Sequence, residues 1–246
     1  MNDDAYTPNA EWYAALTAAW MPETTTALRD LLPPLSNSCA IDIASGIGSQ
    51  TPTLRELGAD RIYAVEPSAA MRVGLMTTVA SDPDLLRHTT IVPLPFPAAL
   101  PHLPDTWRAA IMLNAIGHLS DEDRLALWHA AAARLEPGGR LIISVQPPED
   151  VTTIDWTDFG TVKVGTHRLH TRGRADPLDH QHVEWTIEWT LLDADSEPLE
   201  TRRAHHAWRV VTQAELRREA IAAGLQPVEH TSAPSYLAFE RPGTVR

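Results

Sequence analysis

The chain has 246 residues, 43% apolar and 21% charged, which is enough to bury one α/β domain carrying a smaller insertion. No run approaches the ~18 consecutive apolar residues that a transmembrane helix needs. The formal net charge of −12 argues against broad contact with a nucleic-acid backbone, so we expect neither a nucleic-acid nor a membrane partner.

The first residues, Met1 to Asp4, are acidic and lack the basic and apolar segments of a secretory signal. Cys39 is the only cysteine, which excludes an internal disulfide. Both features fit a reducing compartment, and we expect a cytoplasmic location.

Strand and helix signals alternate through residues 1–150, which is typical of a parallel sheet covered by helices. Two helices are predicted first, over Ala10–Ala19 and Glu23–Leu32, because prolines follow the second. Apolar runs then predict five strands, over Ser38–Ala44, Arg61–Val65, Thr89–Leu94, Ala109–Leu113 and Leu141–Val145. Helices are expected between them, one capped by Ser49 and another opened by the capping box of Ser120 and Asp123.

The pattern changes to period two between residues 151 and 211. Val183, Trp185, Ile187, Trp189 and Leu191 alternate with polar residues, which predicts an amphipathic antiparallel strand. A turn signal at 193–196 predicts a hairpin with residues 200–210. Residues 212–246 then predict a helix opened by Thr212 and two last strands.

These elements predict an α/β fold with a doubly wound, mostly parallel seven-stranded sheet and an antiparallel β cap. We expect a cofactor-binding core at 1–150, a cap over the acceptor site at 151–211, and a C-terminal segment at 212–246 that completes the core sheet.

A glycine turn and two acids carry the chemistry. Asp42 lies in the first strand, small residues follow at Ala44, Ser45, Gly46 and Gly48, and Glu66 ends the second strand. The small residues let the backbone pass close to a ligand. A carboxylate at the end of the neighbouring strand can accept hydrogen bonds from both hydroxyls of a ribose.

Two nucleoside cofactors fit this arrangement. A dinucleotide prefers Gly-x-Gly-x-x-Gly at the turn, whereas here Ala44 and Thr51 stand at the first and last positions. S-adenosylmethionine presents an ammonium and a sulfonium instead of a pyrophosphate. An acid such as Asp42 suits those cations and would repel a phosphate.

The chain resembles class I S-adenosylmethionine-dependent methyltransferases of the small-molecule or natural-product type. Four segments carry the resemblance over nearly the whole length: Asp42–Gly48, Val65–Ser68 with Met71, Leu113–Leu119, and Leu135–Ile143. The resemblance implies S-adenosylmethionine as cofactor and S-adenosylhomocysteine as product. It implies cofactor contacts from these residues: Tyr13, Asp42, Ala44, Ser45, Gly46, Gly48, Glu66, Pro67, Met71, Phe96, Asn114 and Ala115.

Phe96 stands where the family often has an acid that bonds the adenine amine, and it could stack on adenine instead. The acid that commonly opens the fourth strand is also replaced, by Ala109 and Ala110.

His118 follows the fourth strand and is the candidate catalytic base, with a packed or capping histidine as the alternative. Trp185, His206 and Arg209 of the cap are the candidate substrate-binding residues. Six histidines gather in the cap region, but no metal motif accompanies them, so no metal site is predicted: His167, His170, His180, His182, His205 and His206.

The predicted function is methyl transfer to a small molecule or a peptide terminus, with an amine favoured, in specialised-metabolite or modified-peptide biosynthesis. The acidic composition is the physical support for an amine. Oxygen and carbon acceptors stay open. A nicotinamide-dependent dehydrogenase is the alternative enzyme, and a regulatory module that binds an adenosyl ligand is the non-enzyme alternative.

Overall fold

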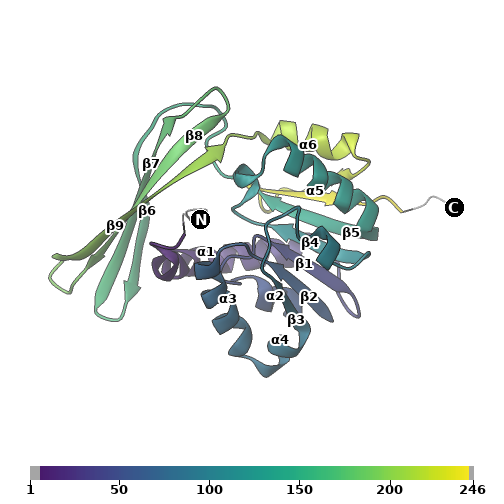
Figure 1. Ribbon diagram of the computed structural model, residues 1–246, viewed down its shortest axis with the longest axis horizontal. Coiled ribbons are helices and arrows are strands. Elements are labelled where there is room, and N and C mark those ends of the chain that lie inside the picture. The colour runs from purple at the N-terminus through teal and green to yellow at the C-terminus, as the bar shows by residue number, and fades with distance from the viewer. Residues whose placement is uncertain (1–5, 244–246) are drawn as a thin grey trace.

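The computed structural model describes residues 6–243, and its strands form two separate sheets (Figure 1). The first sheet contains β1 (Cys39–Ile43), β2 (Arg61–Val65), β3 (Thr89–Val92), β4 (Trp107–Met112), β5 (Leu135–Ser144), β10 (Gln226–Val228) and β11 (Tyr236–Glu240). The second contains β6 (Ile154–Val164), β7 (His167–Pro177), β8 (His182–Leu192) and β9 (Pro198–Arg209). Residues Met1 to Asp4, for which no secretory signal was expected, lie outside the described residues.

The helices are α1 (Ala10–Leu31), α2 (Thr51–Glu56), α3 (Ala69–Ala80), α4 (Pro83–His88), α5 (Asp121–Arg134) and α6 (Gln213–Ala222). Short 3₁₀ turns are η1 (Leu100–His102) and η2 (Ile116–His118). Among residues 6–243, no helix combines the length and the apolar character needed to cross a membrane.

The seven-stranded sheet has the order β10-β11-β5-β4-β1-β2-β3, with β11 antiparallel to its neighbours and the others in the core parallel. This confirms the predicted doubly wound, mostly parallel sheet. The strand order reverses between β1 and β4, and ligands of such sheets bind beyond the carboxyl ends of the strands at this point.

The sheet is covered on both faces. Alternate side chains of β1 point to opposite sides, so Ile41 and Ile43 pack with α5 and α6, and Ala40 packs with α1 and α2. The α5 helix begins with the predicted capping box, in which the Ser120 hydroxyl accepts a hydrogen bond from the backbone N–H of Asp123. Thr212 caps α6 in the same way.

Two local predictions were wrong. Residues 10–31 form one continuous helix instead of two, with Pro22 inside it. The helix buries Trp12 and Leu16 before the proline and Leu28 after it, and this burial outweighs the one backbone hydrogen bond that proline removes. Ser49 does not cap the next helix, because α2 begins later, at Thr51, after Gln50.

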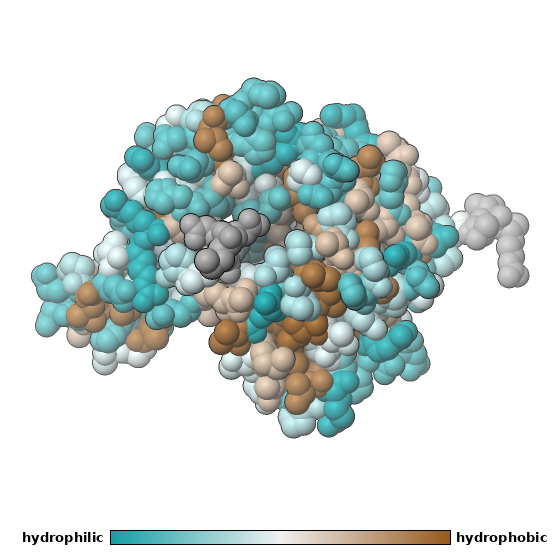
Figure 2. Space-filling model, in the orientation of Figure 1, coloured by the Kyte–Doolittle hydropathy of each residue, from teal (hydrophilic) through white to brown (hydrophobic). Residues whose placement is uncertain are grey.

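The second sheet, which we call the cap, is a curved antiparallel sheet beside the core (Figure 1). Its inner face is apolar, because Val183, Trp185, Ile187 and Trp189 of β8 are all buried there. Its outer face is polar: Glu188 pairs there with Arg172 and Arg203. Figure 2 shows mostly hydrophilic residues over the cap in this view.

Close packing joins the cap to the core at one glycine. The indole of Trp208, from β9, lies against Gly117 of η2, and a Cβ on Gly117 would stand 2.1 Å from Cε2 of that indole. Only glycine allows this approach. The cap therefore lies directly beside the segment that follows β4.

Candidate active site

Glu66 connects the ends of two neighbouring strands. It is buried, and its Oε2 accepts a hydrogen bond from the backbone N–H of Gly46 at 2.8 Å. Its Oε1 accepts one from the backbone N–H of Ser68, also at 2.8 Å. Ser68 in turn caps α3 by accepting a hydrogen bond from the N–H of Met71. One carboxylate thus orders both the glycine turn and the next helix start.

The glycine turn uses left-handed backbone at Gly46, where φ is 57°. A Cβ built on Gly46 would meet no protein atom within 4 Å, because the space beside it is open cavity. Gly48 differs: its φ is 75°, and a Cβ there would stand 2.6 Å from Cδ1 of Leu75. The first glycine faces a ligand space, and the second serves packing.

Asp42 is buried under the turn. The hydroxyl of Thr51 donates a hydrogen bond to its Oδ2 at 3.0 Å. The pKa of Asp42 is raised to about 7, mainly because burial disfavours the charged carboxylate. The hydrogen bond from Thr51 lowers this pKa, and the nearby charge of Glu66 raises it. Near neutral pH this carboxyl therefore exchanges between its charged and neutral forms.

A cavity of about 320 Å³ opens beyond the carboxyl ends of the strands; we call it the strand-end cavity. It brings together ten of the residues singled out in the sequence: Tyr13, Ala44, Gly46, Glu66, Pro67, Met71, Phe96, Asn114, Ala115 and His118. Asp42 and Ser45 line a smaller cavity of about 70 Å³, which shares five lining residues with the strand-end cavity: Tyr13, Ala44, Gly46, Leu113 and Asn114. Gly48 lines neither of these cavities.

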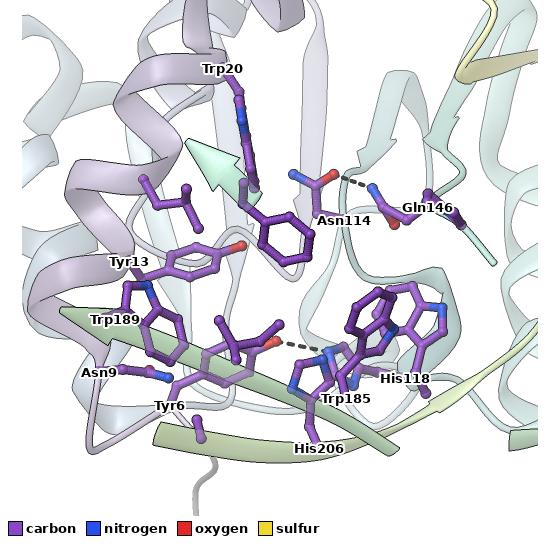
Figure 3. A pocket seen from close by; sticks show the side chains of 16 residues that line it. Tyr6, Asn9, Tyr13, Trp20, Asn114, His118, Gln146, Trp185, Trp189 and His206 are labelled. Carbon is purple, nitrogen blue, oxygen red and sulfur yellow. Dashed lines mark hydrogen bonds between the residues drawn. The ribbon is translucent and has the colours of Figure 1, made fainter. Parts of the chain in front are cut away.

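A second large cavity, of about 300 Å³, lies between α1 and the inner face of the cap (Figure 3). We call it the aromatic cavity. Its walls are predominantly rings: Tyr6, Tyr13, Trp20, His118, Phe159, Trp185, Trp189, His206 and Trp208. Such concave, mostly apolar pockets with a few polar groups are typical of small-molecule sites.

The two large cavities share four wall residues, Tyr6, Tyr13, Asn114 and His118. Asn114 is held in place after β4, since its N–H donates to the Ser144 hydroxyl at 2.7 Å and the Gln146 amide donates to its Oδ1. A group bound in one cavity therefore meets a group bound in the other at these four side chains.

His118 and Tyr13 of this shared wall are neutral near pH 7. His118 faces the open cavity with its ring, yet the surrounding protein desolvates it and lowers its pKa to about 4. Its Nε2 is 2.8 Å from the hydroxyl of Tyr6. Burial raises the pKa of Tyr13 to about 12, with a further contribution from the charge of Glu66.

The cap residues singled out in the sequence divide into two groups. Trp185 and His206 line the aromatic cavity, and the rings of His206 and His118 are 5.6 Å apart between centroids. Desolvation lowers the pKa of His206 to about 4. Arg209 lies elsewhere: it is buried in ion pairs with Asp121 at 2.7 Å and Glu215 at 3.4 Å.

Several wall residues were not among the site residues predicted from the sequence. Trp189 belongs to the predicted alternation that contains Trp185, and Trp208 lies two residues after His206 on β9, so the strand pattern points to both. Tyr6, Asn9, Trp20 and Gln146 gave no such signal, because only the tertiary fold brings α1 and its preceding turn against the cap. Within residues 6–243, no group of three or more metal-ligating side chains could hold a metal ion.

A family model described as a methyltransferase domain matches residues 17–230, which is most of the chain. The chain belongs to this methyltransferase family. Membership decides against the alternatives of a nicotinamide-dependent dehydrogenase and a non-enzymatic binding module. No curated protein matches this methyltransferase in sequence.

Solved structures similar to this methyltransferase span almost all of it. DesVI of Streptomyces venezuelae is 17% identical with a TM-score of 0.73, covering 99% of this chain and 100% of that one. CalS10 of Micromonospora echinaspora, an amino pentose methyltransferase, is 17% identical with a TM-score of 0.66, covering 91% and 90%. KedS8 of Streptoalloteichus, a sugar N-methyltransferase, is 17% identical with a TM-score of 0.65, covering 98% and 89%. At 17% identity, this structural similarity establishes a shared fold.

The methyltransferase is an enzyme, and its strand-end cavity fits S-adenosylmethionine, the cofactor that the sequence resemblance implies. Open space beside Gly46 leaves room for a ligand against the backbone. The Glu66 carboxylate follows β2 and lines this cavity, where carboxylate oxygens can accept hydrogen bonds from ribose hydroxyls. Met71 and Phe96 supply apolar walls for an adenine ring.

Proposed function

We propose that this methyltransferase methylates an amine nitrogen of a small molecule or short peptide in specialised-metabolite or modified-peptide biosynthesis. The observation that carries the proposal is the shared wall of Tyr6, Tyr13, Asn114 and His118, where the strand-end and aromatic cavities meet. The cofactor occupies the first cavity in this proposal, and the acceptor occupies the second.

S-adenosylmethionine supplies a methyl group on a sulfonium, a good leaving group that departs as a neutral thioether. The side chains of the shared wall align the acceptor lone pair with that methyl group and exclude water, which accounts for most of the catalysis in such a displacement. The attacking atom forms one new bond to carbon while the carbon–sulfur bond breaks.

The neutral wall favours an amine over a hydroxyl. A hydroxyl acceptor must lose its proton to a base, and a histidine with a pKa of about 4 is a weak one. An amine attacks through its own lone pair once it is deprotonated. A cavity with little charge favours the neutral amine over the ammonium, since desolvation disfavours the charged form.

The names of similar structures point in the same direction. CalS10 is named as an amino pentose methyltransferase and KedS8 as a sugar N-methyltransferase. MtfA, which is 21% identical with a TM-score of 0.54, is named as a glycopeptide N-methyltransferase. These names support nitrogen as the acceptor atom and specialised metabolism as the setting. They extend to this chain only as part of the proposal.

The test is an untargeted search for acceptors with isotopically labelled methyl donor and metabolite extracts, followed by NMR of each labelled product. The proposal expects the label on nitrogen. Label on oxygen or carbon of the preferred acceptor would overturn the choice of atom. Calorimetric titration with S-adenosylhomocysteine and with NAD is the accompanying check, with binding expected for the first alone.

A further inference from the structure

The aromatic cavity is walled without formal charge. Its 16 lining residues include no Asp, Glu, Lys or Arg. The two histidines among them, His118 and His206, have pKa values lowered to about 4 and are neutral near pH 7. A ligand in this cavity therefore meets ring faces, a few amide and hydroxyl groups, and no counter-ion.

The arginines of the cap are held away from this cavity. Those of β7 lie on the outer face, where Arg172 pairs with Glu188 at 2.6 Å. On β9, Arg203 pairs with the same glutamate from the same face. None of them is available to an anion on the inner face.

Carboxylates also neutralise two further arginines of β9. Arg202 stacks over the Trp12 ring at 4.1 Å and pairs with Glu11 and Glu200. Arg209 is paired with Asp121 and Glu215, as described above. An anionic group in the aromatic cavity would therefore lose its hydration without gaining a cation, which is costly.

From this wall we infer that the acceptor enters the aromatic cavity as an amine on an uncharged, apolar body, with no phosphate or carboxylate on the part that the cavity encloses. The inference rests on the proposed function, because it takes this cavity as the acceptor site. It narrows the acceptor to lipophilic amines, with aryl or alicyclic bodies that pack against Trp185, Trp189 and Trp208.

A matched pair of phenethylamines tests the inference. One carries a para-carbamoyl group and the other a para-carboxylate, so the pair differs in charge and hardly in shape. Calorimetry on the full chain saturated with S-adenosylhomocysteine should show the carbamoyl compound binding at least about tenfold more tightly. Equal or tighter binding of the carboxylate overturns the inference, as does failure of both the carbamoyl compound and unsubstituted phenethylamine to bind.

Two lysine variants place the same charge on opposite faces of the cap. His206→Lys puts it into the aromatic cavity and should erase or reverse the preference for the carbamoyl compound. His205→Lys is the matched control, because His205 is exposed on the outer face, beside Thr186 at 3.1 Å, and should keep the preference. Loss of the preference in both variants would overturn the assignment to this cavity.

The same titrations distinguish a failure of the proposed function from a failure of the uncharged-acceptor inference. Saturation with S-adenosylhomocysteine comes first, and its failure to bind counts against the proposed function. Binding of S-adenosylhomocysteine with no preference between the two phenethylamines counts against the uncharged acceptor alone.

Discussion

The carboxylate of Glu66 and the backbone N–H of Gly46 are joined by a 2.8 Å hydrogen bond across 20 residues of sequence. This bond holds the turn after β1 against the end of β2. The same carboxylate lines the strand-end cavity, and we propose that it binds the ribose of the cofactor. A change at Glu66 therefore alters both the shape of the turn and its affinity for ligand.

Glu66→Ala should weaken the binding of S-adenosylhomocysteine by about 2–3 kcal/mol, because a buried charged acceptor of hydrogen bonds is lost. The chain should still fold, with a lower melting temperature, since the N–H groups of Gly46 and Ser68 lose their acceptor. Calorimetry and thermal unfolding measure the two effects. Glu56→Ala is the control, because Glu56 forms only an exposed pair with Arg29. Unchanged affinity in a folded Glu66→Ala protein would rule out the ribose assignment.

Gly46→Val should prevent cofactor binding by filling the open space beside the turn. The ligand-free protein should lose about 1–3 kcal/mol of stability, because valine is strained at a φ of 57°. Gly48→Ala gives the contrasting case, in which the clash with Leu75 adds to the backbone strain and stability falls further. The measurement is the rise in melting temperature on adding S-adenosylhomocysteine. A wild-type rise in Gly46→Val would place the cofactor elsewhere.

Asp42 should make the ligand-free protein less stable as the pH rises. Its pKa is raised from 3.8 to about 7, so the folded state holds the proton more strongly than the unfolded chain does. The stabilisation is complete below the unfolded pKa and is lost as the pH rises through about 7. Relative to Asp42→Asn, the free energy of unfolding of the wild type should fall by on the order of 3 kcal/mol between about pH 4 and about pH 8. Parallel pH profiles for the two proteins would contradict this.

A cationic ligand next to Asp42 should act in the opposite direction, because it favours the carboxylate. Binding of S-adenosylhomocysteine, which carries an ammonium, should therefore tighten as the pH rises through about 7. Asp42→Asn should remove that dependence. Calorimetric titrations at several pH values measure this dependence. Equal pH dependence in both proteins would show that Asp42 does not interact with the ammonium.

Gly117→Ala should disturb the acceptor site more than the cofactor site. The added methyl group would meet the Trp208 ring, which lines the aromatic cavity, and must displace it. We expect a loss of about 1–3 kcal/mol in stability and a raised KM for acceptor. Trp208→Phe should relieve the clash in the double variant, so the two changes should be less than additive. Strict additivity would show that the two residues act separately.

Trp185→Ala and His206→Ala should lower kcat/KM for the acceptor by about 10–100-fold, since both side chains line the aromatic cavity, the proposed acceptor site. Affinity for S-adenosylhomocysteine should change little. Trp156→Ala is the matched control, because Trp156 is an exposed residue of β6 stacked with Arg172 on the outer face. If the variants lose kcat/KM for the acceptor and affinity for S-adenosylhomocysteine equally, or lose neither, the cap is a structural element and not the acceptor site.

The core sheet and the residues around the strand-end cavity were predictable because both depend on local sequence patterns. Alternation and buried apolar runs located the strands, and the acids and small residues at their ends located the strand-end cavity. The break predicted between Ala19 and Glu23 was wrong, because packing of Trp12 and Leu28 keeps α1 continuous through Pro22. The prediction for Arg209 also failed to place it at the aromatic cavity, because its position at the end of β9 gives no sign that Asp121 lies beside it.

The lining of the aromatic cavity was predictable only on its cap side. The alternation in β8 and β9 places Trp185 and His206 on one face. The opposite wall comes from Tyr6, Asn9 and Trp20, whose sequence gives no hint that α1 faces a sheet that begins more than 120 residues later. Long-range packing decides such contacts.

Tyr6 and Tyr13 belong to the walls of both large cavities, and this has a thermodynamic consequence for turnover. Any shift of the segment from Tyr6 to Tyr13 caused by one ligand changes the free energy of binding of the other. Linkage requires that the effect be reciprocal, so the factor by which S-adenosylmethionine changes acceptor affinity equals the factor by which acceptor changes S-adenosylmethionine affinity. The two substrates are therefore expected to bind cooperatively through this one segment, with release of either product dependent on the other.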